Sequence, residues 1–309
     1  MKPRIAISFS GGRTSAVMTR LLEERYRDSH DLSINFANTG REDPRTLDFV
    51  NNCDIEFGWG VVWLEAEIDP RQGFGVRHRV VDYASASRDG RPFRDYIAKY
   101  GIPNMGSPQC TTRLKENVLD SYRASQGWKR GTYDTAIGIR ADESHRVSAR
   151  AKECRFIYPL VDLGYTKSKV IEEVAAWSFG LGLKEHEGNC MDCWKKSFRK
   201  LATISLEAPE RFQFTRNMEK EFGHFKVTDA TRSPCGRRLF FRGHRTVDDI
   251  FAMGKAVGFK PFTDSYFPNP DTSDILDYGV GCGESCEIGS DERSGNGVET
   301  FDEEEFDWG

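Results

Sequence analysis

The amino-terminal part of the chain alternates apolar runs with amphipathic stretches. Residues 4–9 form an apolar run of strand length, and residues 15–26 carry apolar side chains at helical spacing. The order then repeats, with a strand predicted over 32–37, a helix over 46–53 and a strand over 60–64. This alternation predicts an α/β fold with a doubly wound, mostly parallel sheet, in which ligands bind at the carboxyl ends of the strands.

The pattern is less regular in the middle of the chain. Residues 69–106 are rich in Gly, Arg and Pro, and we expect them to form an insertion of loop and helix. The alternation then returns, and the sequence predicts a helix over 111–125, a strand over 135–139, a strand that ends at 159–160 and a helix over 166–177.

A change of composition near residue 188 divides the chain. Residues 1–187 are predicted to form the α/β domain, and residues 188–267 a smaller, Cys-containing helical and basic region, with helices over 195–205 and from 209 onward. Residues 268–309 form a C-terminal segment that ends in an acidic tail of disordered composition.

Charge is distributed unevenly along the 309 residues. The formal net charge is −4, but residues 284–309 hold ten acidic residues and one basic residue, which leaves +5 on residues 1–283. A mildly basic body suits an anionic substrate. No apolar run approaches the length of a membrane span, and no signal-peptide pattern precedes the first strand. We therefore expect a cytoplasmic protein without a membrane partner.

A glycine-containing turn joins the first predicted strand to the first predicted helix. We call it the glycine loop, and it consists of Ser10, Gly11, Gly12, Arg13, Thr14 and Ser15. Such a turn presents backbone N–H groups at the positive end of a helix dipole, where a phosphate is stabilised. The alternative is an ordinary turn in which a serine caps the helix.

The glycine loop resembles the Ser-Gly-Gly-x-x-Ser loop of the adenine nucleotide alpha-hydrolase (PP-loop ATP pyrophosphatase) superfamily. Motifs further along the chain resemble its PAPS reductase-like family. They are Asn38-Thr39-Gly40, Cys110-Thr111-Thr112-Arg113-Leu114-Lys115, Gly138-Ile139-Arg140-Ala141-Asp142-Glu143-Ser144 and Gly188-Asn189-Cys190-Met191-Asp192-Cys193. The resemblance implies an adenine nucleotide alpha-hydrolase-like fold that binds an adenine nucleotide through residues 10–15 and 38–40.

Two departures from the reductases bear on the choice of nucleotide. The chain keeps an intact Ser-Gly-Gly and lacks the C-terminal Glu-Cys-Gly-x-His segment that many sulfonucleotide reductases carry. Both departures favour ATP. The resemblance then implies a Mg²⁺-dependent enzyme that adenylates a substrate with release of pyrophosphate, for sulfur transfer to a nucleic-acid or small-molecule acceptor, with a sulfur-donor protein as a further partner.

The same motifs supply the candidate catalytic residues. Basic side chains would offset the charge that develops during adenylation, and the candidates are Arg41, Arg113, Lys115 and Arg140. Asp142 and Glu143 would hold Mg²⁺ or a water, because Mg²⁺ prefers oxygen ligands. The alternative for the second group is a solvated acidic turn that caps a helix.

Cysteines are candidate metal ligands. Cys190 and Cys193 have the spacing at which two thiolates face one metal, Cys110 is a third candidate, and Cys286 a fourth, with Cys282 as its alternative. A [4Fe-4S] cluster is the favoured interpretation, ahead of Zn²⁺ and of a pair that binds no metal. In related sulfur-transferring enzymes, a cluster with three protein cysteines leaves one iron open to bind sulfur.

Two further functions stay open at this point. One is a PAPS/APS reductase-like oxidoreductase that reduces a sulfonucleotide, and the other is a non-catalytic nucleotide- or partner-binding protein. Segments 195–200 and 237–245 mix cations with aromatic residues, as nucleic-acid-binding surfaces do. We favour a basic rim beside the site, with Phe240 and Phe241 in the core.

Overall fold

The computed structural model describes residues 2–263, and the C-terminal segment predicted over 268–309 lies outside this range. The strands are β1 (Arg4–Ser8), β2 (Asp31–Asn38), β3 (Val62–Ile68), β4 (Val76–Val81), β5 (Asp134–Ala136) and β6 (Phe156–Ile157). The α-helices are α1 (Arg13–Tyr26), α2 (Pro44–Phe57), α3 (Arg91–Tyr100), α4 (Asn117–Ser125), α5 (Pro159–Asp162), α6 (Lys167–Ala175), α7 (Phe198–Glu207), α8 (Gln213–Phe222) and α9 (Val247–Lys255). Short turns of other helix types are η1 (Thr112–Glu116), η2 (Ala141–Arg146), η3 (Glu185–Glu187), η4 (Pro209–Phe212) and η5 (Arg242–His244).

The sheet has six strands in the order β4-β3-β2-β1-β5-β6. All neighbouring pairs are parallel except β3 and β4. The chain moves from β1 outward through β2 and β3, and later returns to the other side of β1 with β5. The order therefore reverses between β1 and β5, and such a reversal opens a crevice at the carboxyl ends of the two strands. The predicted α/β fold with a mostly parallel sheet is confirmed.

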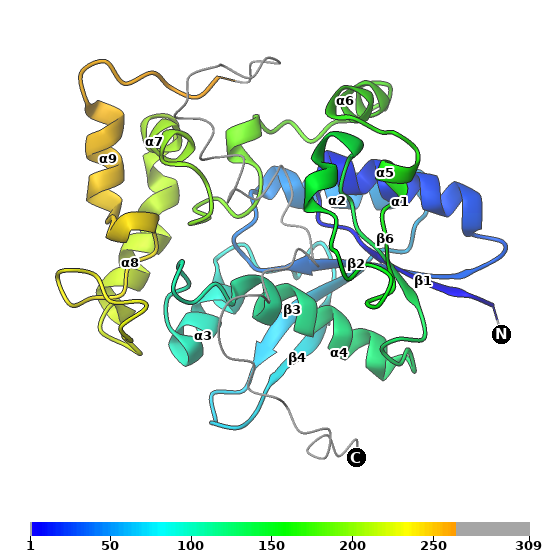
Figure 1. The fold of residues 1–309 in the computed structure, drawn as a ribbon, viewed down its shortest axis with the longest axis horizontal. Coiled ribbons are helices and arrows are strands. Elements are labelled where there is room, and N and C mark those ends of the chain that lie inside the picture. Colours follow the sequence, from blue (N-terminus) through cyan, green and yellow to red (C-terminus); the bar gives the residue numbers. More distant parts are fainter. Residues whose placement is uncertain (1, 264–309) are drawn as a thin grey trace.

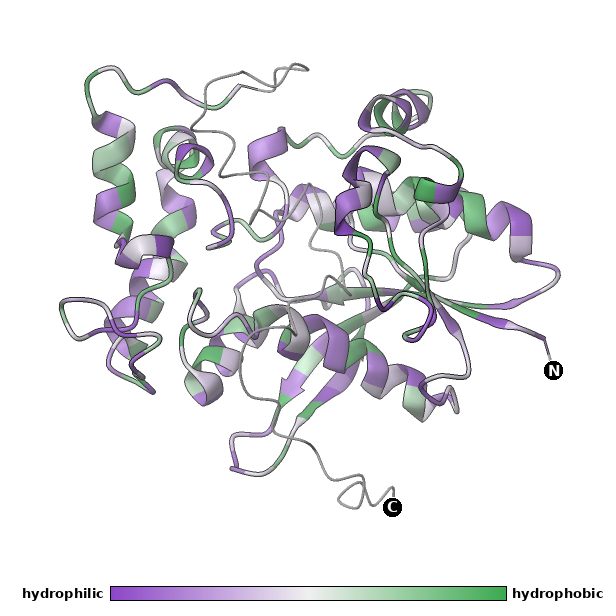
Figure 2. Ribbon diagram, in the orientation of Figure 1, coloured by the Kyte–Doolittle hydropathy of each residue, from purple (hydrophilic) through white to green (hydrophobic). Residues whose placement is uncertain are grey.

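Helices cover both faces of this sheet. Figure 1 shows α1, α2, α5 and α6 on one side and α3 and α4 on the other. Alternate residues of one strand enter different cores, because successive strand side chains point to opposite faces. In β3, Trp63 packs in the core under α1 and α2, while Leu64 packs in the core under α3 and α4. Figure 2 shows hydrophobic residues on the strands and on parts of α1.

The second core continues into the C-terminal helices. Ala37 of β2, Leu64 of β3 and Tyr96 of α3 belong to the same buried cluster as residues from the helical region, namely Trp194, Leu201, Phe212, Phe240, Phe241 and Ile250. The prediction that Phe240 and Phe241 lie in the core is confirmed, since they are 2% and 1% exposed. Residues on both sides of the predicted boundary at 187/188 thus share one core.

Several predicted elements differ from the structure. The edge strand β4 lies in the segment expected to be loop and helix. It was not predicted because charged side chains, such as Arg77 and Arg79, interrupt its apolar residues. The pair 159–160 was predicted to end a strand, but it starts α5, because Pro159 suits the first position of a helix. None of the described helices has the length and apolar character that crossing a membrane requires.

Candidate functional site

The glycine loop lies at the carboxyl end of β1, beside the reversal of strand order. Gly11 has φ of +80°, and Gly12 is the residue before α1, with no side chain capping the helix. Within residues 2–263, no hydrogen bond uses the backbone N–H groups of Gly11, Gly12, Arg13 and Thr14. Both glycines and Thr14 are buried. Buried backbone donors normally have partners, so this turn presents donors for an anion.

The serines of the loop brace its shape. The hydroxyl groups of Ser10 and Ser15 lie 2.8 Å apart, and Ser15 Oγ donates to the carbonyl oxygen of Gly12 at 3.0 Å. Gly11 has a separate packing role, because a Cβ there would lie 2.6 Å from Cγ2 of Thr46 in α2. The loop therefore packs directly against α2, and its serines are engaged within the loop.

Arg140 reaches the glycine loop from the segment after β5. Its Nη1 lies 3.5 Å from Thr14 Oγ1, and the side chain is only 8% exposed. Nε of Arg140 donates to Asp142 at 3.1 Å, and Nη1 lies 3.5 Å from Glu143. Burial alone would raise the pKa of Asp142, but the hydrogen bonds and charge of Arg140 hold this pKa below its usual range. The predicted residues Arg140, Asp142 and Glu143 thus come together, and the carboxylates orient the cation.

The Asn38-Thr39-Gly40 segment follows β2, and its side chains are used internally. Asn38 donates to Glu65 at 2.8 Å and to the carbonyl oxygen of Ser87 at 2.9 Å, and it accepts from the N–H of Gly40 at 3.0 Å. The Thr39 hydroxyl donates to Glu42 at 2.9 Å. These contacts fix the course of the loop, and the role of the three residues in nucleotide binding stays a prediction.

The cysteine turn, residues 188–193, packs on that same loop. The N–H of Met191 donates to the carbonyl oxygen of Arg41 at 2.9 Å, and the Arg41 guanidinium lies 3.1 Å from Asp192. Arg41 and Asp192 are 7% and 5% exposed. The Thr215 hydroxyl of α8 also donates to Asp192. The turn is therefore held by a buried ion pair between segments that are far apart in the sequence.

A second set of ion pairs supports the same junction. Asp43, which caps α2, contacts Arg45 at 2.9 Å and Arg211 at 2.7 Å, and Glu187 contacts the same two arginines at 2.7 and 3.1 Å. None of these four residues, nor Asp192, was predicted as a site residue from the sequence. For Asp192 the local signal was a charged residue between two cysteines, and no spacing rule pairs it with Arg41.

The cysteines differ in their surroundings. Cys190 Sγ lies 3.6 Å from the Thr39 hydroxyl, and the N–H of Cys193 donates to the carbonyl oxygen of Cys190 at 3.2 Å. Cys110 packs against the second core. In the part of the chain that the structure describes, no group of three or more His, Cys, Asp or Glu side chains is arranged to hold a metal ion. Cys286 and Cys282 lie outside the described residues. The described residues alone do not fit a cluster.

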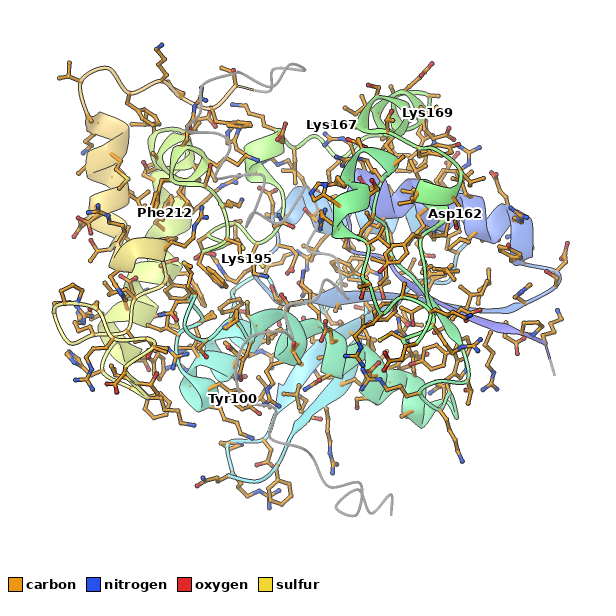
Figure 3. The ribbon with its side chains drawn as sticks, viewed as in Figure 1. Tyr100, Asp162, Lys167, Lys169, Lys195 and Phe212 are labelled. Atoms are coloured by element: carbon orange, nitrogen blue, oxygen red, sulfur yellow. The ribbon has the colours of Figure 1, made fainter. Side chains whose placement is uncertain are left out.

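Buried cations follow the cysteine turn directly. Lys195 is 4% exposed and lies between the C-terminal helices and the sheet (Figure 3), and Lys196 donates to the carbonyl oxygen of His186 at 2.9 Å. Burial lowers the pKa of Lys196 to about 8, although negative charge on Cys193 and Cys190 acts in the opposite direction. The electrostatics of the turn and of Lys196 are therefore linked.

The other predicted cations point elsewhere. The Arg113 guanidinium lies 4.9 Å from the ring centre of Tyr100 in α3, and Lys115 Nζ lies 3.9 Å from Glu42. Among Arg41, Arg113, Lys115 and Arg140, the hydrogen bond to the glycine loop comes from Arg140.

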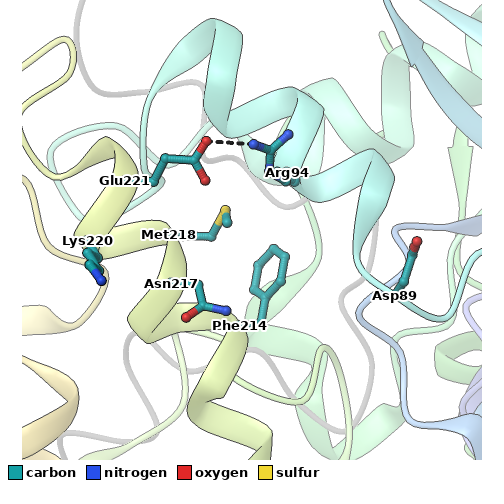
Figure 4. Close-up of a pocket in the computed structure, with 7 residues that line it drawn as sticks. All are labelled: Asp89, Arg94, Phe214, Asn217, Met218, Lys220 and Glu221. Carbon is teal, nitrogen blue, oxygen red and sulfur yellow. Dashed lines mark hydrogen bonds and ion pairs between the residues drawn. The ribbon is translucent and has the colours of Figure 1, made fainter.

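A surface pocket lies apart from the glycine loop. It is formed between α3 and α8 and is lined by Asp89, Arg94, Phe214, Asn217, Met218, Lys220 and Glu221 (Figure 4). Arg94 and Glu221 form an ion pair of 2.6 Å across it. None of these residues belongs to the glycine loop or the cysteine turn. The pocket therefore does not coincide with the residues that were predicted to carry the chemistry.

Fold and site together define an α/β protein with a glycine loop at the reversal of its sheet. No family model matches the chain. Over 289 residues the chain is 32% identical to the "Uncharacterized nin region protein ORF290" of Escherichia phage lambda, an alignment that covers 91% of this chain and 94% of the phage protein. The chain belongs to the same family as this phage lambda protein.

Proposed function

We propose that this protein is a PP-loop ATP-dependent enzyme that adenylates its substrate with release of pyrophosphate. The observation that carries the proposal is the row of backbone N–H groups at Gly11, Gly12, Arg13 and Thr14, which have no acceptor among residues 2–263. The start of a 14-residue helix adds the positive end of its dipole. Phosphate oxygens are the ligands that such a turn favours.

Arg140 supplies the charge in this proposal. Adenylation builds negative charge on the α-phosphate and on the pyrophosphate that leaves, and a fixed cation beside the loop stabilises that charge. Asp142 and Glu143 hold the guanidinium in place, so it needs little reorientation when the nucleotide binds. Mg²⁺ commonly binds through substrate phosphates and retained waters, and it would neutralise phosphate charge here.

The proposed reaction continues with sulfur transfer to the adenylated substrate. It rests on the resemblance of the motifs and on the position of the cysteine turn, which packs on the loop after β2, the strand next to β1. The acceptor is a nucleic acid or a small molecule, and a thiol of the turn would carry the sulfur that a donor protein supplies.

One pair of assays separates this function from its alternatives. The full-length protein, purified under anaerobic conditions, is incubated with ATP and Mg²⁺ or with PAPS and a dithiol, and pyrophosphate and sulfite are measured. We expect equilibrium binding of ATP and slow pyrophosphate release that a substrate accelerates. Sulfite release from PAPS without binding of ATP would establish the reductase-like alternative. A protein inert to both nucleotides would indicate a non-catalytic binding protein.

A matched pair of variants tests the role of Arg140. Arg140→Lys keeps the charge but loses the planar fork that meets Thr14, Asp142 and Glu143, so ATP affinity should fall about ten-fold. Arg146→Lys is the control, since Arg146 contacts Glu143 at 2.8 Å without a contact to the loop. Equal ATP affinity in both variants would remove Arg140 from the proposal.

A further inference from the structure

Cations gather at the start of α7. Residues 195–200 contain four basic residues and no acidic residue. Arg242 joins them from η5, because its Nη2 donates to the carbonyl oxygen of Lys196 at 3.0 Å and its guanidinium lies 5.7 Å from the ring centre of Phe198. We call this set the basic cluster, and its members are Lys195, Lys196, Arg199, Lys200 and Arg242.

The basic cluster lies where the dipole of α7 adds to its positive charge, and Glu185 contacts one of its members, Lys200, at 3.3 Å. The first turn of α7 has no acidic residue, and Arg199 and Lys200 lie at its amino end, where the helix dipole already carries positive charge. Lys195 and Lys196 are 4% and 7% exposed, so water screens their charges poorly. An arrangement of this kind favours binding of a polyanion along the start of α7.

The described chain ends beside this cluster. The N–H of Phe262 donates to Thr203 Oγ1 at 2.7 Å, and its ring centre lies 4.7 Å from Lys200 Nζ and 5.9 Å from the Arg199 guanidinium. Arg199 also donates to the carbonyl oxygen of Pro261 at 3.3 Å. The segment that starts at residue 264 therefore follows directly on residues that contact the basic cluster.

The sequence beyond that point has the complementary charge. Residues 264–309 hold 14 acidic residues and one basic residue, a net charge of −13. The whole chain carries −4, so residues 1–263 carry +9. Residues 188–263 alone hold 15 basic and 8 acidic residues, a net charge of +7. The positive charge of the body is thus concentrated in the region from which the acidic segment departs.

We propose that the acidic segment 264–309 binds the basic cluster of the same chain as an intramolecular polyanion. The tether gives the segment a high effective concentration at the cluster, and the contact is electrostatic, so it weakens as salt rises. The proposal is independent of the nucleotide that the glycine loop binds. A nucleic-acid partner that approaches the cysteine turn along α7 would have to displace the segment.

The direct test observes the C-terminal segment in the full chain. Amide signals of residues 284–309 are compared by nuclear magnetic resonance in the wild type, in the variant Arg199→Glu with Lys200→Glu, and in the control Lys129→Glu with Arg130→Glu. The control cations are exposed and lie between α4 and β5. We expect the signals to shift and sharpen in the cluster variant, to do the same in the wild type at about 0.5 M salt, and to stay unchanged in the control.

One outcome of this comparison would overturn the proposal. If the segment gives the same signals in the wild type, in the cluster variant and at high salt, it does not bind the cluster. Arg199→Gln with Lys200→Gln is a milder variant, with thermal unfolding as the check that α7 is intact. It keeps the comparison valid if the charge reversal disturbs the fold through loss of the Lys200–Glu185 contact of 3.3 Å.

A second measurement asks whether the segment competes with an external polyanion. The tail variant carries Asp302→Asn, Glu303→Gln, Glu304→Gln, Glu305→Gln and Asp307→Asn. The control removes the same charge from exposed sites, with Asp28→Asn, Glu56→Gln, Glu67→Gln, Asp95→Asn and Glu172→Gln. We expect a labelled 20-nucleotide oligothymidylate to bind the tail variant about ten-fold more tightly than the wild type, and the control only slightly more tightly. Equal affinities for the two variants would contradict the proposal.

Discussion

The glycine loop and the cysteine turn are built in opposite ways. The loop is local: its residues are consecutive, its serines bond to each other, and the backbone N–H groups of residues 11–14 have no acceptor among residues 2–263. The turn is held from a distance, through Arg41, which is 151 residues from Asp192, and through Thr215 of α8. Bonds between its own residues help to fix the loop, whereas the turn depends on the junction between the sheet and the C-terminal helices.

The largest effect is expected when the buried ion pair that holds the cysteine turn is removed. Asp192→Asn leaves Arg41 buried and without its carboxylate, and we expect the free energy of unfolding to fall by about 3–5 kcal/mol in urea denaturation. The control Asp248→Asn breaks the exposed pair with Arg216, where the loss should stay below about 1 kcal/mol. Similar losses in both variants would mean that burial does not distinguish the two pairs.

The second test is a substitution in the glycine loop. Gly11→Ala combines a strained positive φ with a Cβ 2.6 Å from Thr46 Cγ2, and we expect a loss of stability of about 2–3 kcal/mol. Gly58→Ala is the matched control, because its φ is +63° but no atom lies within 4 Å of the added Cβ, so it should lose about 1 kcal/mol. Adding Thr46→Ser to Gly11→Ala should recover part of the difference, since serine lacks that methyl group.

The third test concerns Glu219 of α8, which lies in the helical region that holds the turn. It is 6% exposed and accepts from the N–H of Phe240 at 3.1 Å, and burial raises its pKa to about 7. The folded state therefore binds more protons than the unfolded state between about pH 4.5 and pH 7, and stability falls as pH rises through that window. Glu219→Gln should be more stable than the wild type at about pH 8 by about 2 kcal/mol and nearly equal to it at about pH 4.5. Parallel pH profiles of stability would contradict this.

The smallest effect is expected at the contact between the two loops. Thr39→Val removes the hydroxyl that lies 3.6 Å from Cys190 Sγ and also bonds to Glu42, at a cost of about 1 kcal/mol. The rate at which Cys190 reacts with iodoacetamide should change several-fold, since its hydrogen-bonding neighbour is lost. Thr132→Val serves as the control, because that hydroxyl bonds to the carbonyl oxygen of Lys129 and not to Cys190. An unchanged thiol reaction rate would show that the contact does not tune Cys190.

Sequence patterns predicted the first half of the fold well, because β1, the glycine loop and α1 are specified by neighbouring residues. The strand β4 was missed, since it pairs antiparallel at the edge of the sheet and keeps a charged, half-exposed sequence. Of the predicted site residues, Arg140 meets the loop, while Arg113 lies against Tyr100. Spacing in the sequence carries no information about which side chain a long arginine will reach.

By itself, the sequence determined the alternation of strands and helices, the glycine loop at the end of β1 and the strong separation of charge between residues 1–263 and 264–309. These features depend on local periodicity, backbone geometry and composition. Only the tertiary structure decided that Asp192 pairs with Arg41, that Asn38 bonds inward, and that the helical region shares a core with Leu64 and Tyr96. Such contacts join residues far apart in the chain, and their partners are selected by the packing of the whole molecule.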